Sequence, residues 1–207
     1  MYQLYYAPGT AAFAPQMALE EIGADYRLIE TEIAKDKPRD PEFLKLNPNG
    51  WVPVLVDGDL VIHEAAAIVM YLADEHPEAG LAPSPGDPLR GRYFQWLVYM
   101  ADCLQVAYQM NYYPERHSMN RAHNPDIVAK ARERLAWVWG YLDEALDPGP
   151  YLLGDTFSAC DLYVYMLATW HPDGDGFLEG VPNVARCIDK VIQRPAVRRA
   201  MKSHNLV

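Results

Sequence analysis

The chain has 207 residues, half of which are hydrophobic, and its formal net charge is −10 at pH 7. This length is sufficient for one large domain or two small ones around a sizeable core, and the composition excludes global disorder. The negative charge argues against nucleic acid or an anionic membrane as the main partner.

The first 76 residues alternate between strand and helix signals. The period-2 runs, the Gly23 that follows an apolar helical pattern, and an Asp-Gly pair at residues 57–58 set the boundaries. This order predicts a small mixed sheet with helices on its faces. The expected elements are a strand at 3–7, a helix at 14–22, a strand at 26–33, a helical turn around 43–46, two strands within 51–63, and a helix at 64–76.

Proline and glycine are frequent in residues 77–88, which we interpret as a linker. Beyond the linker the strand signals vanish, and the second half is predicted to be all-helical. The fold class is therefore an α/β domain followed by an all-α domain. The expected helices span residues 89–112, 125–146, 158–170, 181–193 and 195–203.

Three cysteines, Cys103, Cys160 and Cys187, are widely spaced in the second half of the chain. Their spacing matches no metal-binding or redox motif, so we expect buried, reduced thiols and no bound metal. Met1 leads directly into a strand-like segment, without a basic leader or an apolar run of membrane-spanning length. We therefore expect a cytoplasmic protein with no membrane partner.

Residues 5–19, YYAPGTAAFAPQMAL, predict a strand, a turn and then a helix that opens at Thr10 or Ala11. The N-terminus of a helix favours an anion, because unpaired N–H groups and the helix dipole point there. A cysteine or serine at such a position often does chemistry. This chain has Thr10, Ala11 and Ala12 instead, so the sequence raises the question of what replaces a nucleophile.

The segment NPNGWVPVL places Pro53 between two strand-forming valines, Val52 and Val54. Proline cannot donate to a sheet ladder, so a special bend with a cis bond before Pro53 is expected. That bend would turn the Val52 N–H and C=O outward, where the backbone of a peptide ligand pairs as an added strand does. An ordinary edge-strand turn is the alternative.

Four stretches stand out: YYAPGTAAFAPQMALEEIG, NPNGWVPVL, HEAAAIVMYLAD and GDTFSACDLYVY. In this order and at these separations they resemble the cytosolic glutathione transferases over essentially the whole chain, nearest to the bacterial beta class. The resemblance implies a thioredoxin-like glutathione-binding domain (1–76), a linker (77–88) and an all-helical domain with a hydrophobic pocket (89–207). It also implies glutathione as substrate, no metal, a small-molecule electrophile and a homodimer active in detoxification.

The resemblance assigns glutathione-binding residues one by one. Trp51, Val52 and Pro53 would meet the cysteinyl unit, and Glu64 would accept a bond from the γ-glutamyl ammonium group. Ala65 replaces the family's serine, so its N–H remains for the ligand carboxylate while a hydroxyl bond of about 1 kcal/mol is lost. For Glu64, a favourable interaction with the helix dipole is the plain structural alternative.

Two further polar residues, Asp102 and Gln105, lie one turn apart in the predicted helix 89–112. In related enzymes a polar group near Asp102 reaches across the dimer interface towards the ligand amine. A surface or interhelical carboxylate is the alternative for Asp102. The aromatic residues of the same helix suit a hydrophobic substrate pocket, although most such residues in helical domains are simply core. The pocket residues we expect are Tyr99, Tyr108 and Tyr112.

The family's reaction needs no protein nucleophile, because the sulfur of glutathione attacks once it is a thiolate. The catalytic cysteine of the beta class would fall at Ala11 and the next serine at Ala12, so a protein-thiol mechanism is not expected. Thr10 is our first candidate for the activating hydroxyl and Tyr6 the second. Thr10 as a helix cap is the alternative, and the backbone amides of Ala11 and Ala12 are a third source of thiolate stabilisation.

The run Ser158 to Asp161 matches a capping box before an apolar helix, and we expect Asp161 to be buried and structural.

As for function, a glutathione transferase is the first hypothesis. A protein that binds glutathione or apolar ligands without activating sulfur is the second, favoured by the alanines at 11, 12 and 65. A module that keeps the fold but binds no glutathione is the third, and retention of Val52, Pro53 and Glu64 argues against it.

Overall fold

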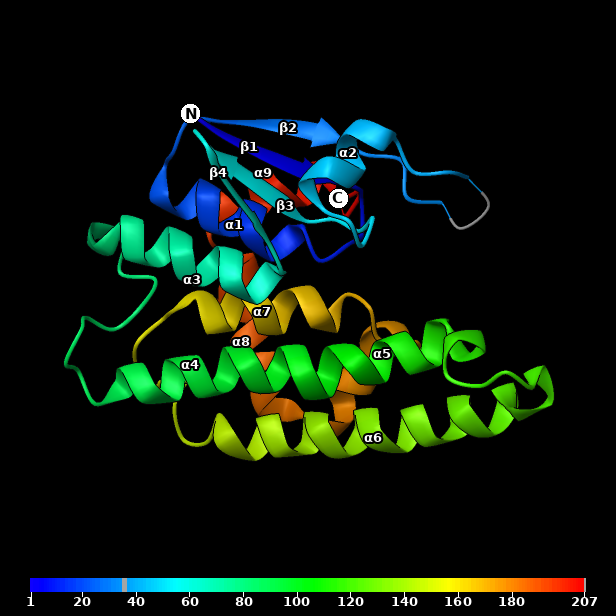
Figure 1. The fold of residues 1–207 in the computed structure, drawn as a ribbon. Coiled ribbons are helices and arrows are strands. Elements are labelled where there is room, and N and C mark those ends of the chain that lie inside the picture. Colours follow the sequence, from blue (N-terminus) through cyan, green and yellow to red (C-terminus); the bar gives the residue numbers. More distant parts are fainter. Residues whose placement is uncertain (35–36, 207) are drawn as a thin grey trace. The chain divides into compact units, whose positions relative to one another are not determined.

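The computed structural model describes residues 1–34 and 37–206 (Figure 1). The chain forms two compact units, and we call them unit 1 (Met1–Ser84 with Val191–Val207) and unit 2 (Pro85–Lys190). The division after Ser84 lies inside the predicted linker. Residues from 191 onward, which the sequence assigned to the helical domain, group instead with unit 1, because α9 (Pro195–Ser203) packs on α1 (Phe13–Ile22).

Unit 1 is built on a four-stranded mixed sheet of order β2-β1-β3-β4, as the strand and helix signals predicted. β1 is parallel to β2 and antiparallel to β3, and β3 is antiparallel to β4. The second strand ends at Glu30 rather than Ile33, and residues 31–34 have no regular structure. The strands are β1 (Tyr2–Tyr6), β2 (Tyr26–Glu30), β3 (Val54–Asp57) and β4 (Leu60–His63).

Helices cover both faces of this sheet (Figure 1). On one face the Tyr5 ring packs on Phe43 of α2 (Pro41–Leu46), with centroids 5.7 Å apart. On the other face, where alternate residues of β1 point, the fully buried Leu4 lies on the side of α1 and α3 (Ala65–Glu75). A short 3-10 helix, η1 (Pro77–Ala79), follows α3.

Ion pairs join α9 to α1. Arg194 donates from Nε and Nη2 to the two carboxylate oxygens of Glu21 at 2.6 and 2.8 Å. One turn away, Arg199 Nε donates to Glu20 at 2.5 Å. The Glu21 side chain is 11% exposed, so its bidentate pair is screened less by solvent than an ordinary surface pair. These contacts explain why the last helix belongs to unit 1.

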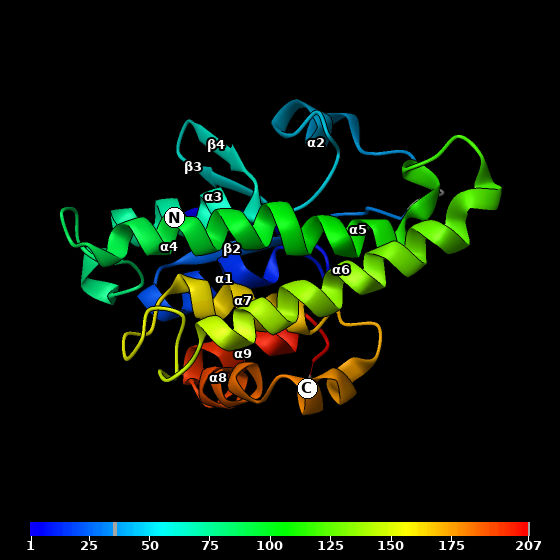
Figure 2. The same ribbon diagram turned by 90° about the horizontal axis from the view of Figure 1, so that it is seen from below.

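Unit 2 is helical in the part that the structure describes, apart from two isolated β-bridges within residues 151–156. α6 lies alongside α5 in both ribbon views (Figures 1 and 2). None of the described helices combines the length and the apolar character needed to cross a bilayer. The elements are α4 (Leu89–Tyr99), η2 (Met100–Leu104), α5 (Gln105–Tyr112), η3 (Pro114–Arg116), η4 (Arg121–His123), α6 (Asn124–Ala145), α7 (Ala159–Ala168), η5 (Gly174–Gly180) and α8 (Pro182–Ile192), the last of which extends into unit 1.

The long helix predicted at 89–112 is present but interrupted. η2 is a π-helical turn between α4 and α5, so each residue after Leu104 is rotated by about 100° relative to a continuous α-helix. Sequence spacing counted at 3.6 residues per turn therefore misplaces side chains across this point. π turns of this kind are frequent at functional sites.

The capping box predicted at residues 158–161 is confirmed. Ser158 is the N-cap of α7 and accepts from the Cys160 N–H at 3.3 Å, and Asp161 accepts from the Ser158 N–H at 2.8 Å. The other oxygen of Asp161 accepts from the Leu152 N–H at 2.9 Å, which holds the preceding loop against the helix. Asp161 is fully buried, and burial raises its pKa to about 6 despite these hydrogen bonds.

We predict that Asp161→Ala lowers the free energy of unfolding by about 3 kcal/mol, because it leaves two buried N–H groups without an acceptor. Urea unfolding monitored by circular dichroism measures this change. Asp155→Ala, a loss of the same side chain at a nearby exposed position, is the matched control and should change stability by less than about 0.5 kcal/mol. Equal effects of the two substitutions would contradict the structural role of Asp161.

Candidate functional site

One edge of the unit 1 sheet gathers the predicted binding segments. Val54 pairs with Tyr5 of β1 and with His63 of β4, so the end of β1, the start of β3 and the end of β4 lie side by side. The turn before α1, the bend at Pro53 and the start of α3 therefore share this edge, which we call the site edge. Ala7, Phe43, Val52 and Val54 form a buried apolar cluster beneath it.

Residues 8–12 form a turn, and α1 begins at Phe13, two or three residues later than the sequence indicated. Thr10 holds this 8–12 turn together. Its hydroxyl donates to the Ala7 carbonyl at 2.7 Å and accepts from the Ala12 N–H at 3.4 Å. The single hydroxyl proton is thus used inside the turn. The bond from the Ala12 N–H is the one that the capping alternative expected, although the N-cap of α1 is Ala12 and not Thr10. A catalytic role for Thr10 stays a prediction.

The Ala11 N–H has no hydrogen-bond partner among residues 1–34 and 37–206. It belongs to the last turn before α1, where the helix dipole favours a negative charge. Ala11 and Ala12 are 8% and 0% exposed, so their methyl groups are part of the buried core and add no polar group to this turn. The arrangement provides an anion-binding position without a nucleophilic side chain.

Tyr6, the second candidate hydroxyl, is the last residue of β1. Its ring packs against the His204 ring, with centroids 5.7 Å apart. Burial, and then the neighbouring Glu30 carboxylate, raises the pKa of the Tyr6 phenol. The phenol therefore remains protonated at neutral pH, so it retains a proton to donate. A catalytic role for Tyr6 also stays a prediction.

The peptide bond between Val52 and Pro53 is cis, as expected. The Val52 side chain is 8% exposed and packs into the cluster with Ala7 and Phe43. Neither the N–H nor the C=O of Val52 has a partner in the described part of the chain, since β3 begins only at Val54. An unpaired donor and acceptor on one residue at a sheet edge are what an extended peptide ligand requires.

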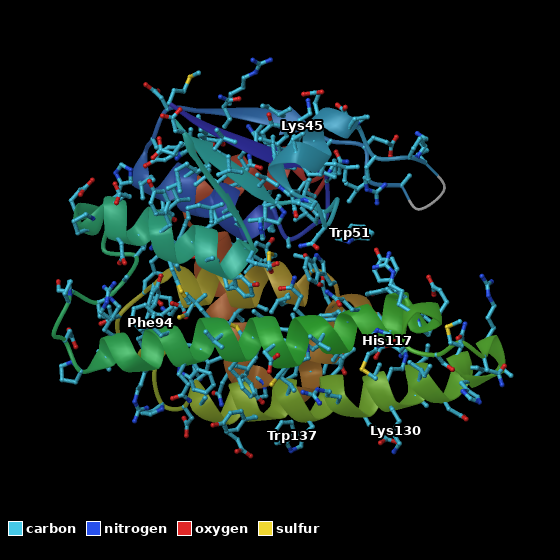
Figure 3. All side chains as sticks on the ribbon, viewed as in Figure 1. Lys45, Trp51, Phe94, His117, Lys130 and Trp137 are labelled. Carbon is cyan, nitrogen blue, oxygen red and sulfur yellow. The ribbon has the colours of Figure 1, made fainter. Side chains whose placement is uncertain are left out.

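Side chains from the preceding loop fix the approach to this bend at Trp51, the residue labelled in Figure 3. Asn47, 3% exposed, donates from Nδ2 to the Trp51 carbonyl at 2.7 Å. Arg39 lies over the Trp51 ring, with its central guanidinium carbon 4.9 Å from the ring centroid, and donates from Nε to the Gly50 carbonyl at 2.7 Å. Sequence reasoning missed Arg39 and Asn47, because both act across a loop that carries no periodic signal.

Glu64, the N-cap residue of α3, has a strained backbone. Its φ of 75° lies in the left-handed region that non-glycine residues rarely adopt. The side chain is 74% exposed and makes no capping hydrogen bond, so it does not serve the helix in the way a cap would. Such strain is concentrated at ligand-binding positions. Next to it, Ala65 presents a first-turn N–H of α3, which has no partner within the helix.

A buried histidine lies behind the 8–12 turn. His204 follows α9 and is 2% exposed, and its Nδ1 accepts from the Gly9 N–H at 3.1 Å. Because Nδ1 accepts, the ring proton is on Nε2, which faces Gln16 Oε1 at 3.1 Å. Burial lowers the pKa of His204 to about 4, so the ring is neutral at physiological pH. A lone histidine near residue 204 gave no signal in the sequence.

Within unit 2, the structure brings together only part of the predicted hydrophobic pocket. Tyr108 and Tyr112 stack at 6.4 Å, and Trp170 meets Tyr108 edge-on at 5.8 Å. Tyr108 is 2% exposed, and its hydroxyl accepts from the indole N–H of Trp139 at 3.0 Å. Tyr108 is thus a core residue, while Tyr112 is 45% exposed.

Tyr99 does not join this pair. Its ring packs edge-on against Tyr141 at 5.5 Å, two residues along α6 from the Trp139 that meets Tyr108. Positions two residues apart on a helix lie on different faces, so Tyr99 and Tyr108 contact different sides of α6. The predicted pocket of Tyr99, Tyr108 and Tyr112 therefore keeps only its last two members in contact, because Tyr99 lies nine residues before Tyr108, about half a turn away around a continuous helix.

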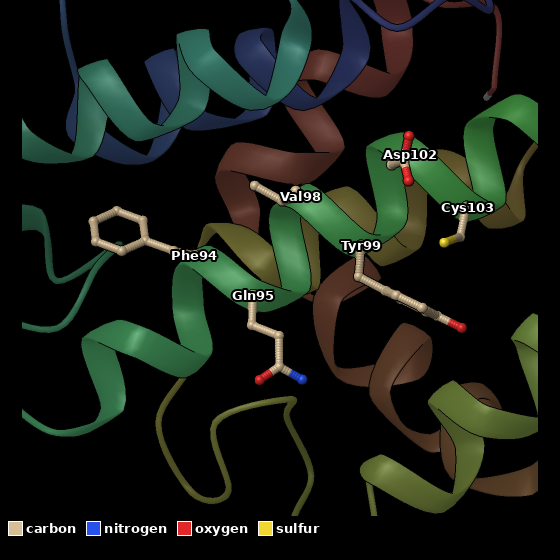
Figure 4. Close-up of a pocket in the computed structure, with 6 residues that line it drawn as sticks. All are labelled: Phe94, Gln95, Val98, Tyr99, Asp102 and Cys103. Atoms are coloured by element: carbon tan, nitrogen blue, oxygen red, sulfur yellow. The ribbon is translucent and has the colours of Figure 1, made fainter.

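Asp102 and Gln105 are also separated. Asp102 is exposed in the π turn, whereas Gln105 accepts a hydrogen bond from the Tyr163 hydroxyl of α7 at 2.7 Å. Gln105 is therefore engaged within unit 2, and the prediction that it shares a face with Asp102 was wrong because the π turn rotates Gln105 relative to Asp102. Asp102 lines an apolar groove of about 440 Å³ on the surface of α4 and η2 (Figure 4). The other lining residues are Phe94, Gln95, Val98, Tyr99 and Cys103.

No group of three or more His, Cys, Asp or Glu side chains in the described ranges is arranged to hold a metal ion. The site edge offers several groups for hydrogen bonding, namely the Val52 backbone, the N–H groups of Ala11 and Ala65, and the Glu64 carboxylate. These groups match a ligand that combines an extended peptide backbone, an ammonium group and an anionic centre.

Comparisons with known proteins identify the family of the chain. The glutathione S-transferase N-terminal domain matches residues 1–74, and a glutathione S-transferase C-terminal domain matches residues 101–204. Glutathione S-transferase GstA from Escherichia coli O157:H7 is 27% identical over 99% of both chains. A sphingomonad glutathione S-transferase solved in complex with glutathione is 30% identical, with a TM-score of 0.85, over 99% of this chain and 100% of its own.

A bacterial beta-class glutathione S-transferase from Sphingomonas chungbukensis is 29% identical, with a TM-score of 0.85, over 99% of this chain and 100% of its own. The fold is a thioredoxin-like sheet domain together with a helical domain. The chain belongs to the glutathione S-transferase family.

We predict that His204 makes stability depend on pH. Its pKa is about 6.5 when unfolded and about 4 when folded, so its contribution is complete above pH 6.5 and is lost as the pH falls through 4. Between pH 7 and pH 4 this loss amounts to about 3 kcal/mol. Urea unfolding of the wild type and of His204→Phe at several pH values isolates it, because every other group titrates in both. The two stability curves should converge in acid, and parallel curves would contradict the prediction.

Proposed function

We propose that this protein is a glutathione transferase that binds glutathione at the site edge and activates its thiol for attack on a hydrophobic electrophile. The unpaired N–H and C=O of Val52 beside the cis bond to Pro53 carry the proposal. They would pair with the cysteinyl backbone of glutathione and bring its sulfur to the 8–12 turn. The complex of the sphingomonad relative with glutathione supports this choice of ligand.

The γ-glutamyl end of the tripeptide would be held by other residues than its cysteinyl unit. Glu64, exposed on a strained backbone, would accept a hydrogen bond from the γ-glutamyl ammonium group, and the Ala65 N–H would bind the adjacent carboxylate. Trp51 and Pro53 would flank the cysteinyl unit. The exposed Asp102 remains our candidate for a contact across a homodimer, whereas the bond from Gln105 to Tyr163 argues against Gln105 as a ligand group.

In the reaction, the thiol proton passes to solvent and the thiolate sulfur attacks an electrophilic carbon. A sulfur–carbon bond forms, and the leaving group departs with its electron pair. We propose that the Ala11 N–H, aided by the helix dipole, stabilises the thiolate, because the Thr10 proton is already donated to Ala7. The family's beta-class cysteine would fall at Ala11, so we place the chain as a beta-like member without that cysteine.

The experiment that tests this function is a glutathione titration monitored by thiolate ultraviolet absorbance across pH. We expect saturable binding and a bound thiol pKa at least about one unit below that of free glutathione. Thr10→Ala should leave this pKa within about 0.3 unit, because the bond from Gly9 to His204 still holds the turn and the Ala11 N–H, not the hydroxyl, stabilises the charge. A rise of a full unit in Thr10→Ala would return the activating role to the Thr10 hydroxyl.

A second variant separates binding from activation. Glu64→Gln should weaken glutathione binding about tenfold or more, the value of one charge-assisted hydrogen bond, while the bound thiol keeps its lowered pKa. Glu75→Gln, at the far end of α3, is the matched control. Binding without any lowering of the thiol pKa would favour the alternative function, a carrier that holds glutathione or apolar ligands without catalysis.

We further propose a homodimer, for which the groove on α4 gives a physical basis. Its walls are two rows of side chains four residues apart, one containing Phe94, Val98 and Asp102 and the other Gln95, Tyr99 and Cys103 (Figure 4). Grooves between such rows receive the side-chain ridge of another helix. Phe94 and Val98 are 38% and 57% exposed, so covering them would remove apolar surface from water.

We expect Val98→Asp to shift the protein from dimer to monomer in sedimentation velocity, because the substitution places a charge in the groove. Ala129→Asp, which places the same charge at an exposed position of α6 outside the groove, is the control and should leave the mass unchanged. A monomeric wild type at micromolar concentration would contradict the dimer.

The proposal also covers the second substrate and the cellular compartment. The partly exposed Tyr112, with the Tyr108 and Trp170 rings beside it, is the aromatic surface we assign to an apolar electrophile. Cys160 and Cys187 are buried, unbridged thiols, which suits the reducing cytoplasm.

A further inference from the structure

Two sets of hydrogen bonds hold the 8–12 turn in place, one within the turn and one to His204. Inside, Thr10 bonds to Ala7 and Ala12. Behind it, the Gly9 N–H donates to Nδ1 of His204 at 3.1 Å, a contact between residues 195 positions apart in the chain. Gly9 has a φ of +69°, which other residues rarely adopt, so the direction of its N–H depends on the shape of this turn. His204 thus fixes the backbone two residues before the Ala11 amide.

His204 is itself held by neighbours on β1 and α1. Its ring lies 4.8 Å from the Phe13 ring of α1 and 5.7 Å from the Tyr6 ring of β1, measured between centroids. Its Nε2 faces Gln16 Oε1 at 3.1 Å. With one nitrogen on the turn and the other on α1, the imidazole is a rigid spacer between them.

The hydrogen-bond network continues beyond Gln16, which is 1% exposed. Gln16 Nε2 donates to Ser203 Oγ at 3.1 Å and to the Tyr26 hydroxyl at 3.2 Å. Tyr26 in turn donates to Glu20 at 2.5 Å. Because both ring nitrogens of His204 have a partner, the ring is held in one orientation between the turn and α1.

We propose that His204 is a positioning residue for the thiol: through Gly9 it orients the 8–12 turn so that the Ala11 N–H faces the sulfur of glutathione. This inference rests on the proposed function and deepens it. His204 touches neither ligand nor sulfur, so it acts only through the backbone. The lone pair on Nδ1 is the essential feature, since an N–H at that position would oppose the Gly9 N–H.

A positioning role and a merely structural role predict different results. If His204 only filled space in the core, its replacement would lower the free energy of unfolding and leave the pKa of the bound thiol unchanged. If it orients the amide, its replacement raises the pKa of the bound thiol and lowers kcat. The affinity for S-methyl glutathione, which has no thiol to ionise, should then be unchanged, because the contacts of Val52 and Glu64 remain.

The test compares three variants. His204→Phe keeps the ring but removes the acceptor, whereas His204→Asn keeps an oxygen near the position of Nδ1. Ser203→Ala is the matched control, because it removes a bond to Gln16 without touching Gly9. We expect His204→Phe to raise the bound thiol pKa by about one unit and to lower kcat about tenfold. His204→Asn and Ser203→Ala should stay near the wild type.

A second measurement needs no ligand. The exchange rate of the Gly9 amide hydrogen with deuterium, measured by NMR, should rise about tenfold or more in His204→Phe but not in His204→Asn or Ser203→Ala. If His204→Phe does not fold, His204→Gln replaces it with the same expectations, because its polar group reaches the Nε2 position and leaves Gly9 without an acceptor.

The outcomes separate the two proposals. A wild type that does not lower the thiol pKa overturns the proposed function. A wild type that lowers it, together with an unchanged thiol pKa in His204→Phe, overturns the positioning role of His204 alone. Unchanged Gly9 exchange in His204→Phe would also overturn it, since the hydrogen bond would then not hold the turn.

Discussion

The candidate site depends on the position of β3 between β1 and β4. Val54 pairs with Tyr5 on one side and with His63 on the other, and this register brings two helix N-termini and the bend at Pro53 to one edge of the sheet. A slip by one residue would turn every side chain of β3 to the opposite face. The buried cluster of Val52, Val54, Ala7 and Phe43 opposes such a slip. The packing of this cluster therefore fixes the positions of the backbone groups at the site edge.

For most helices and strands, the residues close to each boundary were sufficient to predict where the element begins or ends. Gly23 ends α1, and the box from Ser158 to Asp161 begins α7, because each boundary depends on residues within one turn of it. Contacts between distant segments gave no such signal. The bond from Gly9 to His204 joins opposite ends of the chain, and nothing near either residue indicates it. The π turn between α4 and α5 likewise has no signal in the local sequence, so the sequence predicted one continuous helix there.

The chemistry of the site depends on which hydrogen-bonding groups remain for a ligand once the side chains have formed their own bonds. A hydroxyl at position 10 would suggest a catalytic donor, but a hydroxyl has one proton, and Thr10 donates it to the carbonyl of Ala7. The alanines at 11 and 12 are buried and add no functional group, so the backbone N–H of Ala11 is the group that the turn offers to a negative charge. A family whose nucleophile is the sulfur of its own substrate needs only a place where negative charge is favourable. Backbone N–H groups at a helix start provide such a place regardless of the side chains there.

The grouping of residues 191–206 with unit 1 has a consequence for biosynthesis. The ribosome completes the whole of unit 2 before it produces the helix that packs on α1 and the histidine that supports the turn. During that interval the sheet is present but α1 lacks the cover of α9, and Gly9 lacks its acceptor. The nascent protein therefore carries an unfinished ligand site through most of its translation. A chain that stops before residue 195 would retain Val52, Pro53 and Glu64 and still lack the support behind its thiol-binding turn.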